Sequence, residues 1–174
     1  MSVLASPEYG WWKPFPRHEK IWLWMAVAAA VLLSVITIGW LFIGKQNVPV
    51  ASYNATPEQF EQQVTAFTTK YQIQGSPGEV RVPPGQDAYL LGQMWSWGPV
   101  LHLKVGEPYT IWMSSKDVIH GFSLAGQNFN LTAAPGHAYG VRITPEQPGT
   151  YLIFCNEYCG LGHQAMTGKI IVEP

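Results

Sequence analysis

The longest apolar stretch of the chain runs from Ile21 to Ile43 and contains no ionisable side chain. A helix of these 23 residues, at about 1.5 Å per residue, crosses a hydrocarbon core of about 30 Å. Trp22, Trp24 and Trp40 lie near its two ends, where indole rings favour the headgroup region of a bilayer. The pattern predicts a transmembrane helix, preceded by an N-terminal segment over residues 1–20.

A cleavable signal peptide is the alternative to an uncleaved anchor. The apolar region of a signal peptide spans about 7–15 residues and ends in a small-x-small cleavage site. Here the run is longer and closes with the bulky residues Trp40-Leu-Phe-Ile43. The pattern therefore favours the anchor.

Basic residues flank this helix unevenly, which predicts its orientation. Lys13, Arg17 and Lys20 precede it, whereas only Lys45 follows closely. The positive-inside rule therefore predicts a single pass through the cell membrane, with the N-terminus in the cytoplasm and the remainder on the outer, periplasmic side. That compartment is oxidising, so a disulfide between the two cysteines is one open interpretation.

Residues 44–78 are typical of a linker that contains a short helix. Thr56 is a suitable N-cap and Pro57 suits the first helical position. Four apolar residues then recur along one helical face: Phe60, Val64, Phe67 and Tyr71. This face predicts a helix that packs against the following domain.

From residue 79 to residue 174 the pattern changes to short β-type runs separated by Gly and Pro. Six runs have this character: Ala88–Trp97, Val100–Val105, Tyr109–Ser114, Ala138–Ile143, Thr150–Phe154 and Lys169–Val172. Six or more strands at this spacing predict a β-sandwich of about 95 residues. The expected fold class is mainly β, preceded by one transmembrane helix and the short connector helix.

Composition narrows the function classes. Charged residues make up 12% of the chain, against roughly 25% in typical soluble proteins, which agrees with a membrane segment. Lys and Arg number 10 and Asp and Glu 11, a net charge of -1, so the basic surface that nucleic-acid phosphates require is missing. We also find no nucleophile–base pair and no carboxylate dyad.

The chemistry is concentrated in the stretch Phe154–Met166, which follows a predicted strand. Four soft donors lie within it: Cys155, Cys159, His163 and Met166. Thiolate, imidazole and thioether ligands together favour copper over magnesium, calcium or manganese. Two cysteines four residues apart in one loop can bridge a pair of metal ions, whereas a single blue-copper site needs only one cysteine.

This loop lacks a second imidazole. His120 lies after the predicted strand Tyr109–Ser114, and loops at one end of a sandwich converge, so His120 is a candidate. His18, His102 and His137 compete, and the residues favour His120 only weakly over His137. Two other interpretations of the cysteines are a disulfide and a tetrahedral zinc site, although the latter usually has paired short spacings that are absent here.

Two segments resemble the copper A domain of subunit II of haem-copper cytochrome c oxidases. They are Asp117-Val-Ile-His120-Gly-Phe122 and Cys155-x3-Cys159-x3-His163-x2-Met166. The single anchor, and the loop reading Cys-Asn-x-Tyr-Cys-Gly-Leu-Gly-His, are similar to the B family of these oxidases. The resemblance covers the β-domain and, through the anchor, most of the chain.

The resemblance implies a cupredoxin-like Greek-key sandwich with a dinuclear copper A centre of two copper ions. It implies that Cys155 and Cys159 bridge the coppers, while His120 and His163 each complete one of them. Met166 is then a weak axial ligand. The backbone carbonyl of Glu157 lies opposite it, and Asn156 and Tyr158 within the loop are either supporting groups or ordinary packing.

Trp95 and Trp97 alternate within one predicted strand, so both rings are expected on one side, by default in the core. The resemblance adds that an aromatic residue in this segment receives the electron, and Trp95 is the favoured one. Glu157 stands where B-family members have glutamine and A-family members have a glutamate that holds magnesium at the subunit interface. A magnesium site and a solvated glutamate are both open for Glu157.

The implied function is electron acceptance from a c-type cytochrome and delivery to the haem-copper catalytic subunit I, in a respiratory complex that also pumps protons. Haems belong only to that partner, and oxygen is reduced there. An alternative is a membrane-anchored copper-binding or copper-delivery protein that acts alone. A third is nitrous oxide reductase, but 174 residues leave no room for its propeller.

Overall fold

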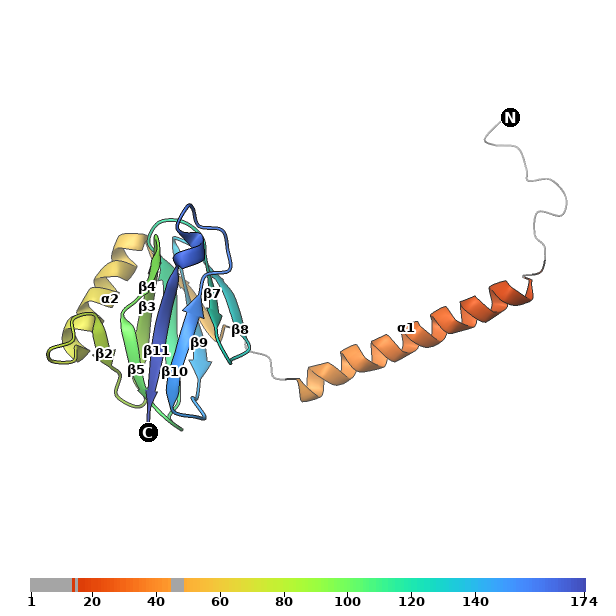
Figure 1. The fold of residues 1–174 in the computed structure, drawn as a ribbon, viewed down its shortest axis with the longest axis horizontal. Coiled ribbons are helices and arrows are strands. Elements are labelled where there is room, and N and C mark those ends of the chain that lie inside the picture. Colours follow the sequence, from red (N-terminus) through yellow and green to blue (C-terminus); the bar gives the residue numbers. More distant parts are fainter. Residues whose placement is uncertain (1–13, 15, 45–48) are drawn as a thin grey trace, which may run out of the picture. The chain divides into compact units, whose positions relative to one another are not determined.

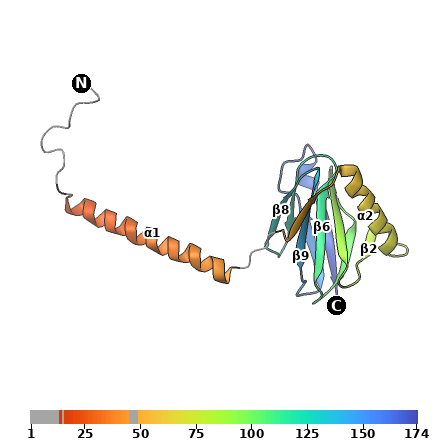
Figure 2. The same cartoon turned by 180° about the vertical axis from the view of Figure 1, so that it is seen from behind.

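The computed structural model describes residues 14, 16–44 and 49–174 and divides into two units. The first, Met1–Lys45, contains helix α1 (Arg17–Ile43), and the second, Gln46–Pro174, contains the strands (Figures 1 and 2). Lys13 and Lys45, on which the predicted orientation partly depends, lie outside the described residues.

Helix α1 ends at Ile43, as predicted, and begins one turn earlier than the apolar run. The added turn, Arg17-His-Glu-Lys20, carries the charges that precede the apolar run. None of the residues of α1 is buried, and its large apolar side chains are exposed along its length. Because apolar surface in water costs about 25 cal/mol per Å², such a helix is suited to lipid, and within the described chain it is the candidate membrane span.

Helix α2 (Pro57–Tyr71) confirms the predicted connector helix. Thr56 accepts a hydrogen bond from the backbone of Gln59, whose side chain in turn accepts one from the backbone of Thr56, so both halves of a capping box are present. The predicted stripe of Phe60, Val64 and Phe67 is buried against the β-domain. Figure 1 shows α2 lying along one side of the strands.

In the part of the chain that the structure describes, eleven strands form the sheet: β1 (Ala51–Asn54), β2 (Glu79–Arg81), β3 (Asp87–Gln93), β4 (Ser96–Gly98), β5 (Val100–Lys104), β6 (Tyr109–Ser115), β7 (His120–Leu124), β8 (Phe129–Ala133), β9 (His137–Ile143), β10 (Gly149–Phe154) and β11 (Thr167–Glu173). Their order is β1-β9-β6-β3-β4-β11-β10-β7-β8, and β5 pairs with both β11 and β2. Neighbours in space are often distant in sequence, and the sheet folds over itself as the predicted sandwich (Figures 1 and 2).

Five of the six predicted strands are present with ends shifted by at most two residues. The sixth, Ala88–Trp97, is wrong as a single strand. It is divided into β3 and β4, which pair antiparallel with Gly92 opposite Trp97, and the chain turns at Met94 and Trp95. The β-type composition continues through this turn, so the pattern alone does not reveal it.

The pairing of β7 with β10 positions the loop that contains Cys155 and Cys159. These strands are antiparallel, with Ser123 opposite Phe154 and Leu124 opposite Ile153. The first residue of β7, His120, therefore lies beyond the end of β10, where the loop with both cysteines begins. In Figure 1 this loop and the 3₁₀ helix η1 (His163–Ala165) lie at one end of the sandwich.

Candidate metal centre

Two free cysteines lie in the loop that follows β10. Cys155 is 9% exposed and Cys159 is 3% exposed, and their Sγ atoms are 3.6 Å apart. When two sulfur atoms each lie about 2.3 Å from one metal ion, they are less than about 4.6 Å from each other. The two side chains can therefore share an ion without movement of the backbone.

Each cysteine has a different histidine beside it. The Nδ1 atom of His120 lies 4.0 Å from Cys155 Sγ, and the Nδ1 atom of His163 lies 3.6 Å from Cys159 Sγ. His120 is completely buried, and its ligand atom lies within 4.8 Å of both sulfurs. Each sulfur therefore has the imidazole nitrogen of a different histidine beside it.

Two weaker donors complete the set. The thioether sulfur of Met166, a buried residue, lies 3.5 Å from Cys159 Sγ. The backbone carbonyl oxygen of Glu157 lies 3.1 Å from Cys155 Sγ. The structure therefore places all six predicted donor groups of the loop and of β7 in one cluster, with one weak donor beside each cysteine.

Asp117 fixes the orientation of His120. Its Oδ1 atom lies 2.7 Å from His120 Nε2, and its Oδ2 atom accepts a hydrogen bond from the backbone N–H of Met94 at 2.7 Å. Because a carboxylate only accepts, His120 Nε2 carries the proton and Nδ1 offers its lone pair toward Cys155. Burial opposes the ionisation of Asp117, but the hydrogen bonds from Met94 and His120 outweigh it and lower its pKa.

Burial raises the pKa of the Cys159 thiol to about 11, and the neighbouring Cys155 adds to the effect. In the absence of a cation this side chain is therefore a neutral thiol at neutral pH. A bound metal ion supplies the positive charge that displaces such a proton. The site is suited to a cation of soft character.

The loop fits closely against β7 and against the turn between β3 and β4. A Cβ atom at Gly121 would lie 1.9 Å from Asn156 Oδ1, and one at Gly162 would lie 2.3 Å from Trp95 Cδ2. Asn156 also donates a hydrogen bond to Asn130 Oδ1 in β8 at 2.7 Å. Backbone and side-chain contacts on both sides therefore hold the loop.

The two tryptophans have different environments, contrary to the expectation that they share one side of a strand. Trp95 lies in the turn between β3 and β4 and is 43% exposed, and its Nε1–H donates to the carbonyl oxygen of Cys159 at 3.2 Å. Trp97 lies in β4, is 4% exposed and packs edge-on against His120, with ring centroids 6.1 Å apart. The two side chains differ in environment because the chain turns at Met94 and Trp95 instead of continuing as one strand.

Two of the competing histidines, His102 and His137, have partners outside the cluster. His102 lies between Glu79 and Glu173, at 3.0 and 2.9 Å, and His137 contacts Asn54 at 2.9 Å. His18 belongs to α1.

The carboxylate of Glu157 is exposed and has Thr132 Oγ1 3.4 Å away. Among the described residues, the group of His, Cys, Asp and Glu side chains close enough to hold a metal is His120, Cys155 and Cys159. Within the described part of the chain, the carboxylate of Glu157 therefore belongs to no group of three such side chains close enough to share a metal ion. The role of Asp117 was not predicted from the sequence. The available signal was its position three residues before His120, close enough for the two side chains to meet.

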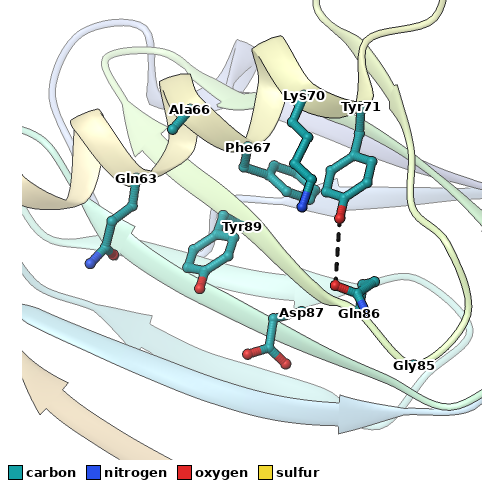
Figure 3. Close-up of a pocket in the computed structure, with 9 residues that line it drawn as sticks. All are labelled: Gln63, Ala66, Phe67, Lys70, Tyr71, Gly85, Gln86, Asp87 and Tyr89. Carbon is teal, nitrogen blue, oxygen red and sulfur yellow. Dashed lines mark hydrogen bonds between the residues drawn. The ribbon is translucent and has the colours of Figure 1, made fainter.

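A separate cavity of about 510 Å³ lies between α2 and the start of β3 (Figure 3). Its walls include Phe67, Lys70 and Tyr71 from the helix and Asp87 and Tyr89 from the strand. None of its lining residues belongs to the metal-binding cluster. The cavity therefore does not give access to the cysteines.

The fold and the cluster define a class of protein: a cupredoxin-like copper domain that follows a membrane-type helix. A structure of the copper protein rusticyanin superposes with a TM-score of 0.50, covering 71% of this chain and 98% of that chain. At 15% sequence identity this is a likeness of fold.

Sequence comparison is more specific. The family model for the periplasmic domain of cytochrome c oxidase subunit II matches residues 93–174. A cytochrome c oxidase subunit 2 of Thermus thermophilus is 38% identical over 117 residues, which are 67% of this chain and 68% of that protein. An alternative cytochrome c oxidase subunit 2 of Bradyrhizobium diazoefficiens is 25% identical over 176 residues, covering 91% of this chain and 61% of that protein.

A chain of a heme-copper terminal oxidase dimer, solved by cryo-EM, superposes with a TM-score of 0.59 at 31% identity, covering 90% of this chain and all of that one. The protein belongs to the cytochrome c oxidase subunit II family. It is thus a membrane-anchored component of an oxidoreductase complex.

Proposed function

We propose that this chain is the electron-accepting subunit of a terminal oxidase and that its cluster holds two copper ions. The observation that carries the proposal is the pair of buried cysteine sulfurs 3.6 Å apart with a different histidine beside each one. Cys155 and Cys159 would bridge the two ions, and His120 and His163 would each bind one. Met166 and the carbonyl of Glu157 would be weak ligands at the two ends.

The donor set fits copper better than the alternatives. Thiolates, imidazoles and a thioether are soft ligands, which copper accepts and which magnesium and calcium do not. A tetrahedral zinc ion would use both cysteines and both histidines and would leave Met166, at 3.5 Å from Cys159 Sγ, without a role. The arrangement of one histidine and one weak donor at each cysteine favours two ions.

Copper bound there supplies a carrier of one electron at a time. The protein keeps its ligands still, because Asp117 fixes the ring of His120 and the hydrogen bond between Asn156 and Asn130 secures the loop. Burial of Cys155 and Cys159 excludes water from the sulfurs. A site whose ligands and solvent move little on a change of charge transfers electrons quickly.

Trp95 supports a path from the surface to this site. Its ring is partly exposed, and its Nε1–H donates directly to the carbonyl of Cys159. Tyr158, also exposed, lies in the same loop, with its ring 5.9 Å from that of His163. We infer that a c-type cytochrome docks on this apolar surface and that Trp95 receives its electron; Trp97, which is buried against His120, is the second candidate.

The partner that receives the electron would be the haem-copper subunit I of the same complex. This inference rests on membership of the subunit II family and on the relative that was solved as part of a heme-copper terminal oxidase dimer. The anchor α1 would cross the cell membrane once, with the N-terminus inside and the copper domain on the periplasmic side.

Electron paramagnetic resonance tests the proposed centre. The full chain, purified in detergent and loaded with copper, should give a seven-line hyperfine pattern from one unpaired electron shared by two copper nuclei. A four-line pattern would refute the shared site. Tagged chain isolated from membranes should also bring down a haem-containing integral protein, and its isolation without haem would instead support a copper-delivery protein that acts alone.

A further inference from the structure

The sulfurs of the proposed copper centre are difficult to reach from solvent. Cys155 and Cys159 are buried, and so are the ring of His120 and the thioether of Met166. Among the proposed ligand side chains only that of His163 is partly exposed. A soft donor at the surface beside the loop would give dissolved Cu(I) a first contact before the thiols bind it.

Met94 has the position for that contact. It lies in the turn between β3 and β4 and is 48% exposed. Of the sulfur-bearing residues described between 49 and 174, Met94 is the only exposed one. Its Sδ atom is 3.8 Å from the place of a Cβ atom on Gly160, the residue that follows Cys159.

The fold holds the backbone of Met94 beside the ligand loop. Its N–H donates to Asp117 Oδ2 at 2.7 Å, and Asp117 also binds His120. The next residue, Trp95, donates from its ring to the carbonyl of Cys159. The turn is thus tied to Asp117 and to Cys159, while the side chain of Met94 is exposed.

We propose that Met94 captures Cu(I) at the surface and passes it to Cys159. This inference rests on the proposed copper site. The thioether replaces one ligand of the incoming Cu(I) complex, the sulfur of Cys159 then replaces the thioether, and the thiol proton goes to water. The ion remains Cu(I) throughout, so no electron is needed.

The chemistry of the side chain agrees with this role. A thioether is a soft ligand that selects Cu(I) and has no proton to lose, so it binds and releases the ion without acid or base. The alternative role of Met94 is apolar contact with the electron donor. Leucine provides a similar volume without the sulfur, and the two roles are therefore separable.

The experiment measures copper uptake by the full chain in detergent, free of metal and with reduced thiols, under anaerobic conditions. Cu(I) bicinchoninate is the copper source, and stopped-flow absorbance follows its loss. Met94→Leu should slow uptake by about tenfold, within the range in which association rates of related variants differ, and should leave the final copper content unchanged. Met94→His, which restores a copper-binding side chain, should recover most of the rate.

Leu161→Ala is the matched control, because Leu161 is an exposed apolar residue of the loop that carries Cys159 and has no donor atom. Its uptake rate should equal that of the wild type. Uptake by Met94→Leu at the wild-type rate would overturn the capture role, and so would a loss of final copper content, which would make Met94 a permanent ligand. Failure of the wild-type chain to take up copper would instead overturn the proposed copper site.

Discussion

The contact between Gly121 and the metal-binding loop gives the sharpest structural prediction. In Gly121→Ala the new Cβ atom would lie 1.9 Å from Asn156 Oδ1, 2.7 Å from Asn156 N and 2.8 Å from Glu157 N. Ordinary contacts begin at 3.4 Å, so the two backbone nitrogens must move away by 0.7 and 0.6 Å. The Asn156 side chain must also rotate, which breaks its 2.7 Å hydrogen bond to Asn130.

These shifts set the expected loss of stability and of copper retention. Overpacking of this kind typically costs about 1–3 kcal/mol, and displacements above about 0.5 Å exceed the tolerance of a preorganised site. Because Asn156 lies between Cys155 and Glu157, the shift reaches two of the proposed copper ligands directly. At 1.4 kcal/mol per tenfold, copper retention against a competing chelator should fall by roughly 5- to 150-fold.

Chelator competition and thermal unfolding of the metal-free chain measure the two consequences separately. Gly98→Ala is the matched control, since a Cβ atom at Gly98 meets nothing within 4 Å and its φ is not positive. It should retain copper as the wild type does. Wild-type copper retention by Gly121→Ala would show that the loop is not held as tightly as its contacts imply, and would refute the reasoning.

Four further predictions concern the copper ligands, the surface charge, an ion pair and a second metal. Cys155→Ser should remove the seven-line electron paramagnetic resonance signal, because a single remaining cysteine sulfur cannot bridge the two ions equivalently. Met166→Leu should keep this signal and shift the reduction potential. Retention of the seven-line signal in Cys155→Ser would contradict the bridging role. From residue 51 onward the chain has six Lys and Arg and nine Asp and Glu, a net charge of -3. The rate of electron transfer from a basic cytochrome should therefore depend only modestly on salt concentration. A hundredfold loss of that rate between low and physiological ionic strength would contradict a largely apolar interface. Hydrogen bonds from Arg81 and His102 lower the pKa of Glu173 from its ordinary value. The contribution of this carboxylate to stability is therefore fully present above the ordinary pKa and is lost as the pH falls through the lowered one. Glu173→Gln should lower the melting temperature slightly at pH 7, because exposed ion pairs contribute little, and should not lower it at a pH where the carboxylate is protonated in both states. If Glu157 binds a hard metal in the assembled complex, cells grown with manganese should yield a complex whose manganese signal disappears in Glu157→Gln, and an intact wild-type complex without manganese would remove the hypothesis.

Much of the fold was predictable because its signals are local. The apolar run of α1 and the cap and stripe of α2 each lie within a few turns of chain, and the structure confirms both. Four strands were missed. β1 and β2 have only four and three residues, and β7 and β8 are short and contain Gly121 or polar residues of low β-propensity such as Asn130. Their pairing with each other and with β10 stabilises them, and pairing is not visible in a single segment.

The residues of the candidate site likewise divide into those brought together by their spacing in the sequence and those brought together by strand pairing. Cys155, Cys159, His163 and Met166 share one loop, so their spacing alone brought them together. His120 needed the register between β7 and β10, and for this reason the residues by themselves hardly separated it from His137. The hydrogen bond from Met94 to Asp117 depends on the turn at Met94, which the pattern had concealed within one long strand.

The backbone and the side chain of Glu157 lie in different surroundings, so its proposed role as a copper ligand does not depend on the type of its side chain. Its backbone carbonyl lies 3.1 Å from Cys155 Sγ, on the inner side, whereas its carboxylate is exposed near Thr132. Any amino acid supplies the carbonyl, so the proposed copper site leaves the side chain at this position free for another role. A residue with its backbone toward the metal and its charge toward the surface can connect the copper loop to a partner subunit without altering the copper ligands.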